Sequence, residues 1–305
     1  MKLYLSLIFG FFCFYNLMSQ GCSDAGFCTL NSLNVKKSDS LDSKYTNQIK
    51  IGGSYGKADH DIQVISSFIE YHKEVSSKTS ADIKLAFSSQ NGETASGLSI
   101  SNFNVSDLYL NVNWKIVRNM QFTFGFKVPM QDGNMKIKGA PAPLDYQASL
   151  GTFDAIFGVA YNIKNIYLFL AAQQPLTQNK NSYLNCNGNE IVYNLQSTNK
   201  FERNGDILLR ISYPIQISNK FSIIPSILPI YHLKEDTYFD SCNNRSETIT
   251  GSKGITVNGN LFLGYDLTRR NRINVSAGFP LVVRDVRPDG LTRKFVAGLE
   301  YQFRF

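Results

Sequence analysis

Large apolar side chains alternate with small polar ones in many separate segments of this chain, and this pattern limits its fold more than any other feature. In the last segment, 294–305, the apolar side chains fall on one face and mainly polar ones on the other. Successive side chains of a strand point to opposite faces, so a period of two predicts β-strands. The same alternation recurs over 108–116, 120–128, 255–265 and 273–279.

After residue 20 the sequence has no apolar run of about 18 residues, the length that a membrane-spanning helix needs. A soluble β-sandwich would alternate in the same way. A mature chain that lies in a membrane must be a closed barrel, because only closure satisfies every backbone N–H and C=O group in lipid. Aromatic residues make up 13% of the chain and charged residues 18%, against a usual ~25% charged. This composition favours strands over helices.

The lengths of the connections distinguish a closed membrane barrel from a soluble β-sandwich, because outer-membrane barrels have short periplasmic turns and longer outer loops. Short polar connections lie at 76–80, 117–119, 162–165, 218–219 and 268–271, and long ones at 90–104, 131–150, 177–203, 235–254 and 285–290. This alternation predicts an all-β fold, a transmembrane antiparallel up-and-down β-barrel with both termini periplasmic. The first outer connection, 58–60, is short, so ten or fourteen strands also fit. We expect twelve strands, near 47–57, 61–74, 81–89, 105–117, 119–131, 151–163, 165–176, 204–217, 220–234, 254–267, 270–283 and 291–305.

The first 20 residues are typical of a secretory signal peptide: Lys2 precedes the apolar stretch 3–18, and 19–21 offers small residues for cleavage. A retained anchor and a lipidated Cys22 are the alternatives. Residues 21–46 are polar and lack periodicity, so we expect a periplasmic segment or a plug, followed by the barrel at 47–305. The formal net charge is +7, but Lys and Arg are scattered, so no nucleic-acid partner is expected.

The mature chain has four cysteines, and an even count in an exported protein suggests two disulfides. The simplest of the three connectivities pairs Cys22 with Cys28, and Cys186 with Cys242. The alternative is a copper or zinc site at Cys22, Cys28 and Asp24, but a full ligand set is missing. We therefore expect no metal and no cofactor.

Charged residues on the polar faces of the strands are expected to point inward, because charge facing lipid is costly. They would either line a water-filled path or form a salt-bridged filling, since a barrel of about twelve strands is intermediate in width. These candidate lumen-lining residues are Lys115, Lys127, Asp154, Arg210, Asp266, Arg272, Lys294, Glu300 and Arg304.

Catalytic motifs are missing from the sequence: it has no Gly-x-Ser-x-Gly, phosphate loop or dinucleotide fingerprint. His232 lies near Asp236 and Asp240, and His60 lies between two aspartates, but both groups are more typical of polar loop edges. An enzyme is not expected, and a membrane-embedded hydrolase is a minor alternative.

The segment GFKVPMQDGN, followed by APLDYQASLGTFDAIFGVAYNIKNIYLFLAAQQPL, resembles outer-membrane proteins of the MetA-pathway phenol-degradation family, distant relatives of the FadL-like hydrocarbon channels. The matching motifs are Lys127-Val128-Pro129 and 150–154. The family's segment places its Asp one position later, and the hatch sequence of the fatty-acid members is absent. The Ser-Gln end of the signal resembles exports of Bacteroidetes, and Phe305 resembles the terminal aromatic by which barrel-assembly machinery recognises its substrates.

The resemblance implies an outer-membrane channel or transporter for passive uptake of a small, hydrophobic or aromatic solute in a Gram-negative cell. The expected partners are outer-membrane lipid, the assembly machinery and the solute. The alternative is a structural or surface-interaction barrel with a closed lumen and disulfide-pinned outer loops.

Overall fold

A computed structural model of the chain describes residues 45–58, 61–93, 99–185, 195–288 and 293–305. The predicted signal peptide, 1–20, and nearly all of the predicted N-terminal segment, 21–46, lie outside the described residues. Among the residues that are described, no helix is long and apolar enough to span a membrane.

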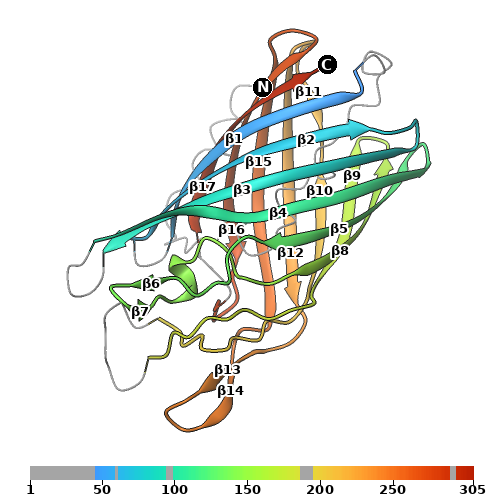
Figure 1. Cartoon of the computed structure of the whole chain (residues 1–305). Coiled ribbons are helices and arrows are strands. Elements are labelled where there is room, and N and C mark those ends of the chain that lie inside the picture. Colours follow the sequence, from blue (N-terminus) through green and yellow to red (C-terminus); the bar gives the residue numbers. More distant parts are fainter. Residues whose placement is uncertain (1–44, 59–60, 94–98, 186–194, 289–292) are drawn as a thin grey trace, which may run out of the picture.

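Twelve long antiparallel strands form one closed barrel (Figure 1). The first strand pairs with the last, with Gln48 opposite Arg304, and β10 pairs directly with its neighbour β12. Each of the twelve strands therefore has a partner on both sides. The predicted count of twelve is confirmed. The strands are β1 (Asn47–Ala58), β2 (Gln63–Glu74), β3 (Thr79–Glu93), β4 (Ser99–Val117), β5 (Met120–Pro129), β8 (Asp154–Ile163), β9 (Ile166–Pro175), β10 (Asp206–Ser212), β12 (Phe221–His232), β15 (Gly254–Asp266), β16 (Asn271–Val282) and β17 (Arg293–Arg304).

The barrel has two different ends. At the short-turn end, brief connections at 75–78, 118–119, 164–165, 217–220 and 267–270 join the strands. The C-terminus lies at this end too, where the backbones of Asn47 and Phe305 exchange hydrogen bonds of 3.1 and 3.0 Å. A two-residue strand, β11 (Ile215–Gln216), continues β10 past Pro214 toward one of these turns.

The opposite, long-loop end carries extra structure. Its elements are the pair β6 (Lys136–Ile137) and β7 (Ala140–Pro141), the short 3-10 helix η5 (Leu144–Tyr146) and the hairpin β13 (Asp236–Asp240) and β14 (Arg245–Ile249) (Figure 1). The sequence predicted long loops here but not the hairpin inside 235–254. The predicted loop 90–104 is instead largely strand, because β3 runs to Glu93 and β4 begins at Ser99.

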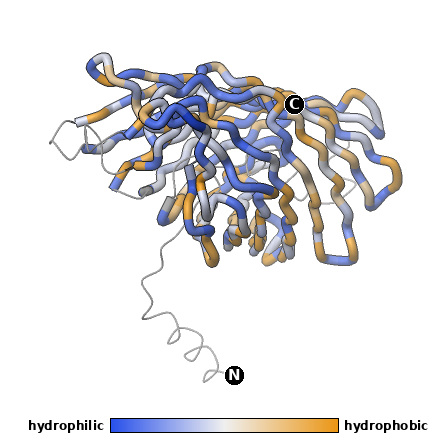
Figure 2. The backbone as a smooth tube through the Cα atoms, turned by 90° about the horizontal axis from the view of Figure 1, so that it is seen from below, coloured by the Kyte–Doolittle hydropathy of each residue, from blue (hydrophilic) through white to orange (hydrophobic). Residues whose placement is uncertain are grey.

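The outward face of the barrel carries many exposed large apolar side chains. Figure 2 shows hydrophobic and hydrophilic residues alternating along the strands, as the sequence predicted. In β9, for example, Leu170 is 52% exposed whereas its neighbours Phe169 and Ala171 are buried. Similar exposed side chains occur on every side of the ring, including Ile69, Val112, Ile227 and Leu299. A closed barrel with such an exterior is suited to lipid, because no backbone edge and few charges face outward.

The long loops form a small apolar core of their own. Tyr146 of η5 is fully buried and packs with Ile62, Ile100 and Tyr183. Its hydroxyl lies so close to β3 that a Cβ added at Gly92 would be 3.0 Å away. A second cluster of Leu144, Phe201 and Ile249 joins the loops before β8, β10 and β15. The long loops therefore pack against one another and against the ends of the neighbouring strands.

An arginine in place of Leu170 should destabilise the barrel, because the side chain lies in the middle of β9 on the outward face. We expect a loss of about 2–4 kcal/mol in unfolding free energy, the cost of Arg near a bilayer midplane. Leu176→Arg is the matched control: Leu176 is equally exposed, at 56%, but follows the end of β9, where the cost is about 0–1 kcal/mol. Denaturant unfolding in phospholipid vesicles measures both, and equal losses would contradict a lipid-facing wall.

Candidate functional site in the barrel interior

One wall of the barrel interior is densely filled. The inward faces of β8, β9, β10 and β12 carry Ile156, Phe169, Leu208 and Leu228, each with 0% exposure, in a cluster that also includes Tyr109 and Tyr167. A water-filled path would leave the side chains along its wall accessible. The interior beside these four strands is therefore occupied by side chains.

The opposite wall differs, because small residues dominate its inward face. Ser54 of β1, Ser276 and Gly278 of β16 and Gly298 of β17 are all partly exposed although they point away from the outer surface. Gly298 is in register with both Ser54 and Ser276, and a Cβ added to it would lie 2.6 Å from Ser276 Oγ. We call these four residues the small-residue wall. Their partial exposure indicates solvent-accessible space beside this wall.

Two phenylalanine rings border the small-residue wall, and each is backed by a buried cation. Phe68 of β2 lies against β1, where a Cβ at Gly52 would be 2.6 Å from the ring, and Lys84 Nζ is 3.8 Å from the ring centroid. On the other side, the Arg210 guanidinium carbon is 5.7 Å from the ring centroid of Phe262 on β15. Both rings are half-buried. Cation–π contacts of this kind hold the rings in place.

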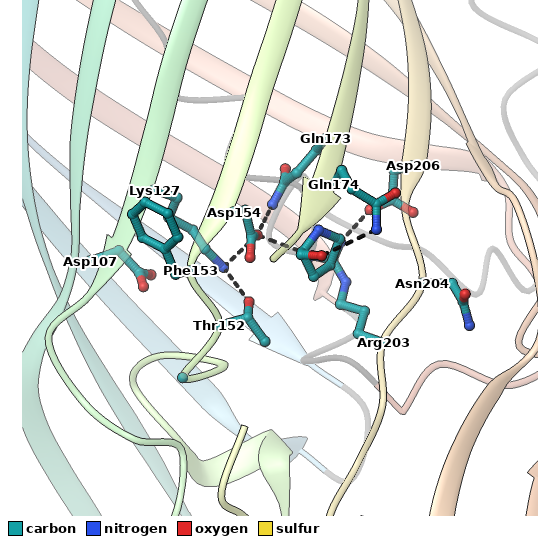
Figure 3. Close-up of polar contacts among 12 residues, drawn as sticks. Asp107, Lys127, Thr152, Phe153, Asp154, Gln173, Gln174, Arg203, Asn204 and Asp206 are labelled. Carbon is teal, nitrogen blue, oxygen red and sulfur yellow. Dashed lines mark hydrogen bonds and ion pairs between the residues drawn. The ribbon is translucent and has the colours of Figure 1, made fainter. Parts of the chain in front are cut away.

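A group of buried charges lies near the long-loop end, and we call it the Asp154 cluster (Figure 3). Lys127 Nζ is 2.9 Å from Asp154 Oδ2 and donates a hydrogen bond of 3.0 Å to Thr152 Oγ1. Arg203 contacts the same carboxylate at 3.4 Å and also pairs with Asp206. Gln173 Nε2 donates to Asp154, and His232 Nδ1 pairs with Asp206. Asp154 and Asp206 have no exposed surface at all.

Arg203 is the member of this cluster that a loop contributes. Its backbone N–H donates to Gln178 Oε1 at 2.9 Å, and Gln178 Nε2 donates to the Arg203 carbonyl at 3.1 Å. The segment between β9 and β10 is thereby fastened between the carboxylates of β8 and β10. The carboxylates of Asp154 and Asp206 therefore each contact a fixed cation, which such a desolvated site requires.

A second polar chain crosses the strands closer to the short-turn end. His72 Nδ1 is 2.5 Å from Asp82 Oδ1, Asn113 donates to Asp82 at 2.6 Å, and Thr123 donates to Asn113 at 2.7 Å. Beside it, Lys50 Nζ is 3.3 Å from Glu70 Oε1. These contacts join side chains of neighbouring strands into a rigid lining.

The predicted lumen-lining residues fall into three groups. The structure places Lys127, Asp154 and Arg210 on the buried inner face, and the first two pair directly across β5 and β8. Arg272 pairs with Asp266 at 3.1 Å. Glu300 belongs to the same group, lies deeper in the barrel than Arg272, and accepts a 2.8 Å hydrogen bond from Asn274. The rest lie nearer the rims: Arg304 is half-buried, Lys115 is 4.0 Å from Glu74, and Lys294 is exposed.

Several interior residues were missed by the sequence reasoning. Lys50, Glu70 and Lys84 occupy polar positions in strands with alternating apolar and polar residues. The same alternation that placed Lys127 and Asp154 inward therefore predicts that they also point inward. Arg203 had no such signal, because it belongs to a loop. His232 was considered beside Asp236 and Asp240, whereas the structure pairs it with Asp206.

The proposed disulfides lie largely outside the described residues. Cys242 is disulfide-bonded, and its pairing with Cys186 stays a prediction because Cys22, Cys28 and Cys186 are not described. Within the described ranges, no group of three or more His, Cys, Asp or Glu side chains could hold a metal ion.

The fold and the partly filled interior define a class, the twelve-stranded membrane β-barrels. No protein-family model matches the sequence, and no curated protein sequence matches it. The structure is similar to that of an outer-membrane channel from Pseudomonas putida F1, with a TM-score of 0.55 and 10% identity over 89% of this chain and 100% of that one. It also aligns with the NanC porin (TM-score 0.48, 9% identity, 84% and 100% covered) and the CymD monoaromatic hydrocarbon channel (0.46, 7%, 86% and 89%). At such identities the likeness to the Pseudomonas channel shows the fold alone: this chain has the fold of an outer-membrane β-barrel.

Substitution of Asp154 by Asn should destabilise the barrel strongly, because Lys127 and Arg203 would lose their shared carboxylate inside a desolvated site. Removing one partner of a buried ion pair costs about 3–5 kcal/mol. The control is Glu247→Gln, which breaks a pair with Arg245 whose arginine side chain is 68% exposed and should cost about 0–1 kcal/mol. Guanidinium unfolding in detergent gives both values. A loss for Asp154→Asn as small as that of the control would contradict the importance of the cluster.

Proposed function

We propose that this chain is an outer-membrane channel for passive uptake of a small, hydrophobic or aromatic solute, with its path along the small-residue wall. The observation that carries the proposal is the contrast between the two interior walls. Ser54, Ser276 and Gly298 stay partly exposed on their inward faces, whereas Phe169 and Leu228 on the other wall have none of their surface exposed.

The borders of the path suit such a solute. Phe68 and Phe262 present half-buried ring surface on its two sides, and aromatic rings favour apolar and aromatic ligands. The hydroxyls of Ser54 and Ser276 keep the space between them polar enough to hold water. The similar solved structure from Pseudomonas putida F1 is described as a channel, which supports conduction as the purpose of such a path.

The proposal includes export by the signal peptide at 1–20, both termini on the periplasmic side and outer loops pinned by a Cys186–Cys242 disulfide. The separation of short turns from long loops supports that orientation. The disulfide-bonded state of Cys242 supports the pinned loops. Barrel-assembly machinery would recognise the chain through Phe305, which directly follows β17 at the short-turn end.

The alternative function is a closed structural or surface-interaction barrel. The filled wall and the Asp154 cluster favour it, because both exclude solvent from much of the interior. Planar-bilayer recording separates the two functions. The absence of both current and solute-dependent liposome swelling with the wild-type chain would contradict the channel and support the closed barrel.

Replacement of Ser276 by Phe should obstruct the path and reduce conductance several-fold, since the new ring would project from the small-residue wall. Val275→Phe is the matched control: Val275 neighbours Ser276 on β16 but is 44% exposed on the outward face, so its flux should equal the wild-type value. Bilayer conductance and liposome swelling with arabinose and phenylalanine provide the measurement. Equal flux in both variants would place the path elsewhere.

A further inference from the structure

The five short turns share one chemical property: each carries a cation, and none carries a carboxylate. They contribute six basic residues, which we call the turn cations, and every one is exposed. The long loops at the opposite end differ, because they mix both signs, as Lys234 and Glu235 show. The turn cations are Lys78, Arg118, Lys164, Lys220, Arg269 and Arg270.

The turn cations are not neutralised by carboxylates. Of the ion pairs in the part of the chain that the structure describes, none includes any of the six. Arg270 contacts an aromatic residue instead, with its Nε 3.5 Å from Tyr45 Oη and its guanidinium over that ring. Another exposed cation does find a partner: Arg245 Nε is 2.5 Å from Glu247 Oε1. In the part of the chain that the structure describes, the five turns therefore present a ring of positive charge that no ion pair neutralises.

Aromatic side chains on the outward face indicate where the turn cations lie along the membrane normal. Trp114 is 54% exposed, Tyr265 44% and Tyr161 40%, and they precede the cations of their turns by three or four residues. Trp and Tyr gather at the level of lipid headgroups. At about 3.3 Å per residue and a tilt of roughly 40°, the cations lie only about 8–10 Å further out. Long Lys and Arg side chains reach back over that distance.

We propose that the turn cations bind the phosphate groups of anionic phospholipids in the leaflet at the short-turn end. The inference depends on the barrel lying in a membrane and not on whether it conducts. The ring has no ion-pair partners among the described residues, follows the short turns around the barrel and lies just beyond the aromatic side chains. Its complement is a leaflet that offers phosphates on all sides. Each lipid held by one cation should be enriched about five-fold over a neutral lipid.

The test uses the whole folded chain reconstituted in phosphatidylcholine vesicles that contain a minority of phosphatidylglycerol. Spin-labelled phosphatidylglycerol and spin-labelled phosphatidylcholine report how strongly each lipid associates with the barrel. One variant replaces all six turn cations by Gln. The matched control replaces six exposed lysines of the long-loop end by Gln, at positions Lys136, Lys138, Lys180, Lys200, Lys234 and Lys253.

The wild-type chain and the long-loop control should prefer phosphatidylglycerol several-fold, and the turn variant should lose that preference. The preference should also fade in about 1 M salt, because the Debye length is then about 3 Å and the attraction between the cations and the lipid phosphates is screened. No preference in the wild-type chain, or equal preference in the two variants, would overturn the proposal. Binding of inorganic phosphate that the turn variant loses, without any preference of the wild-type chain for phosphatidylglycerol, would also overturn it, because it would indicate a site for the free ion only. Heat-modifiable gel migration identifies the variants that fold. If the six-fold variant does not fold, the separate variants Arg118→Gln and Lys164→Gln replace it, and each should lower the preference for phosphatidylglycerol.

Discussion

The pairing of β1 with β17 is the interaction on which the rest of the structure depends. Lipid offers no partner to a backbone N–H or C=O group, so a sheet in a membrane must have no free edge. The register from Gln48 opposite Arg304 to Lys57 opposite Phe295 supplies this closure. Once the ring is closed, one face of every strand meets lipid and the other meets the interior. The apolar positions must then point outward, which inverts the arrangement of a soluble β-sandwich.

Closure also decides what the interior can contain. Its polar residues are removed from bulk water, and an isolated charge there is costly, so charges gather into contacts such as Lys127 with Asp154 and Lys50 with Glu70. The Asp154 cluster and the apolar side chains of β8 to β12 fill one side. Serine and glycine on β1, β16 and β17 leave the other side open. The proposed path follows from this asymmetry and does not require a wide barrel.

The sequence predicted the strands well because their signal is local. β9 was expected at 165–176 and spans Ile166–Pro175, since alternating apolar residues and the short connection 162–165 define both its faces and its start. The inward parity of Lys127 and Asp154 followed from the same alternation, but that they are direct partners depends on the register of β5 with β8. Arg203 could not be predicted, because its loop has no period and its contacts join residues far apart in sequence. The hairpin of β13 and β14 could not be predicted for a similar reason, because its strands are short and lie against other loops.

The central claim is that the interior is open beside the small-residue wall and filled beside β9, β10 and β12. Cysteine accessibility tests it most directly, with Ser276→Cys and Leu228→Cys compared against the unsubstituted chain as background. A small, charged, water-soluble thiosulfonate reagent should label Ser276→Cys in the folded barrel and leave Leu228→Cys unlabelled until the chain is unfolded. Equal labelling at the two positions, or protection of Ser276→Cys, would contradict the account.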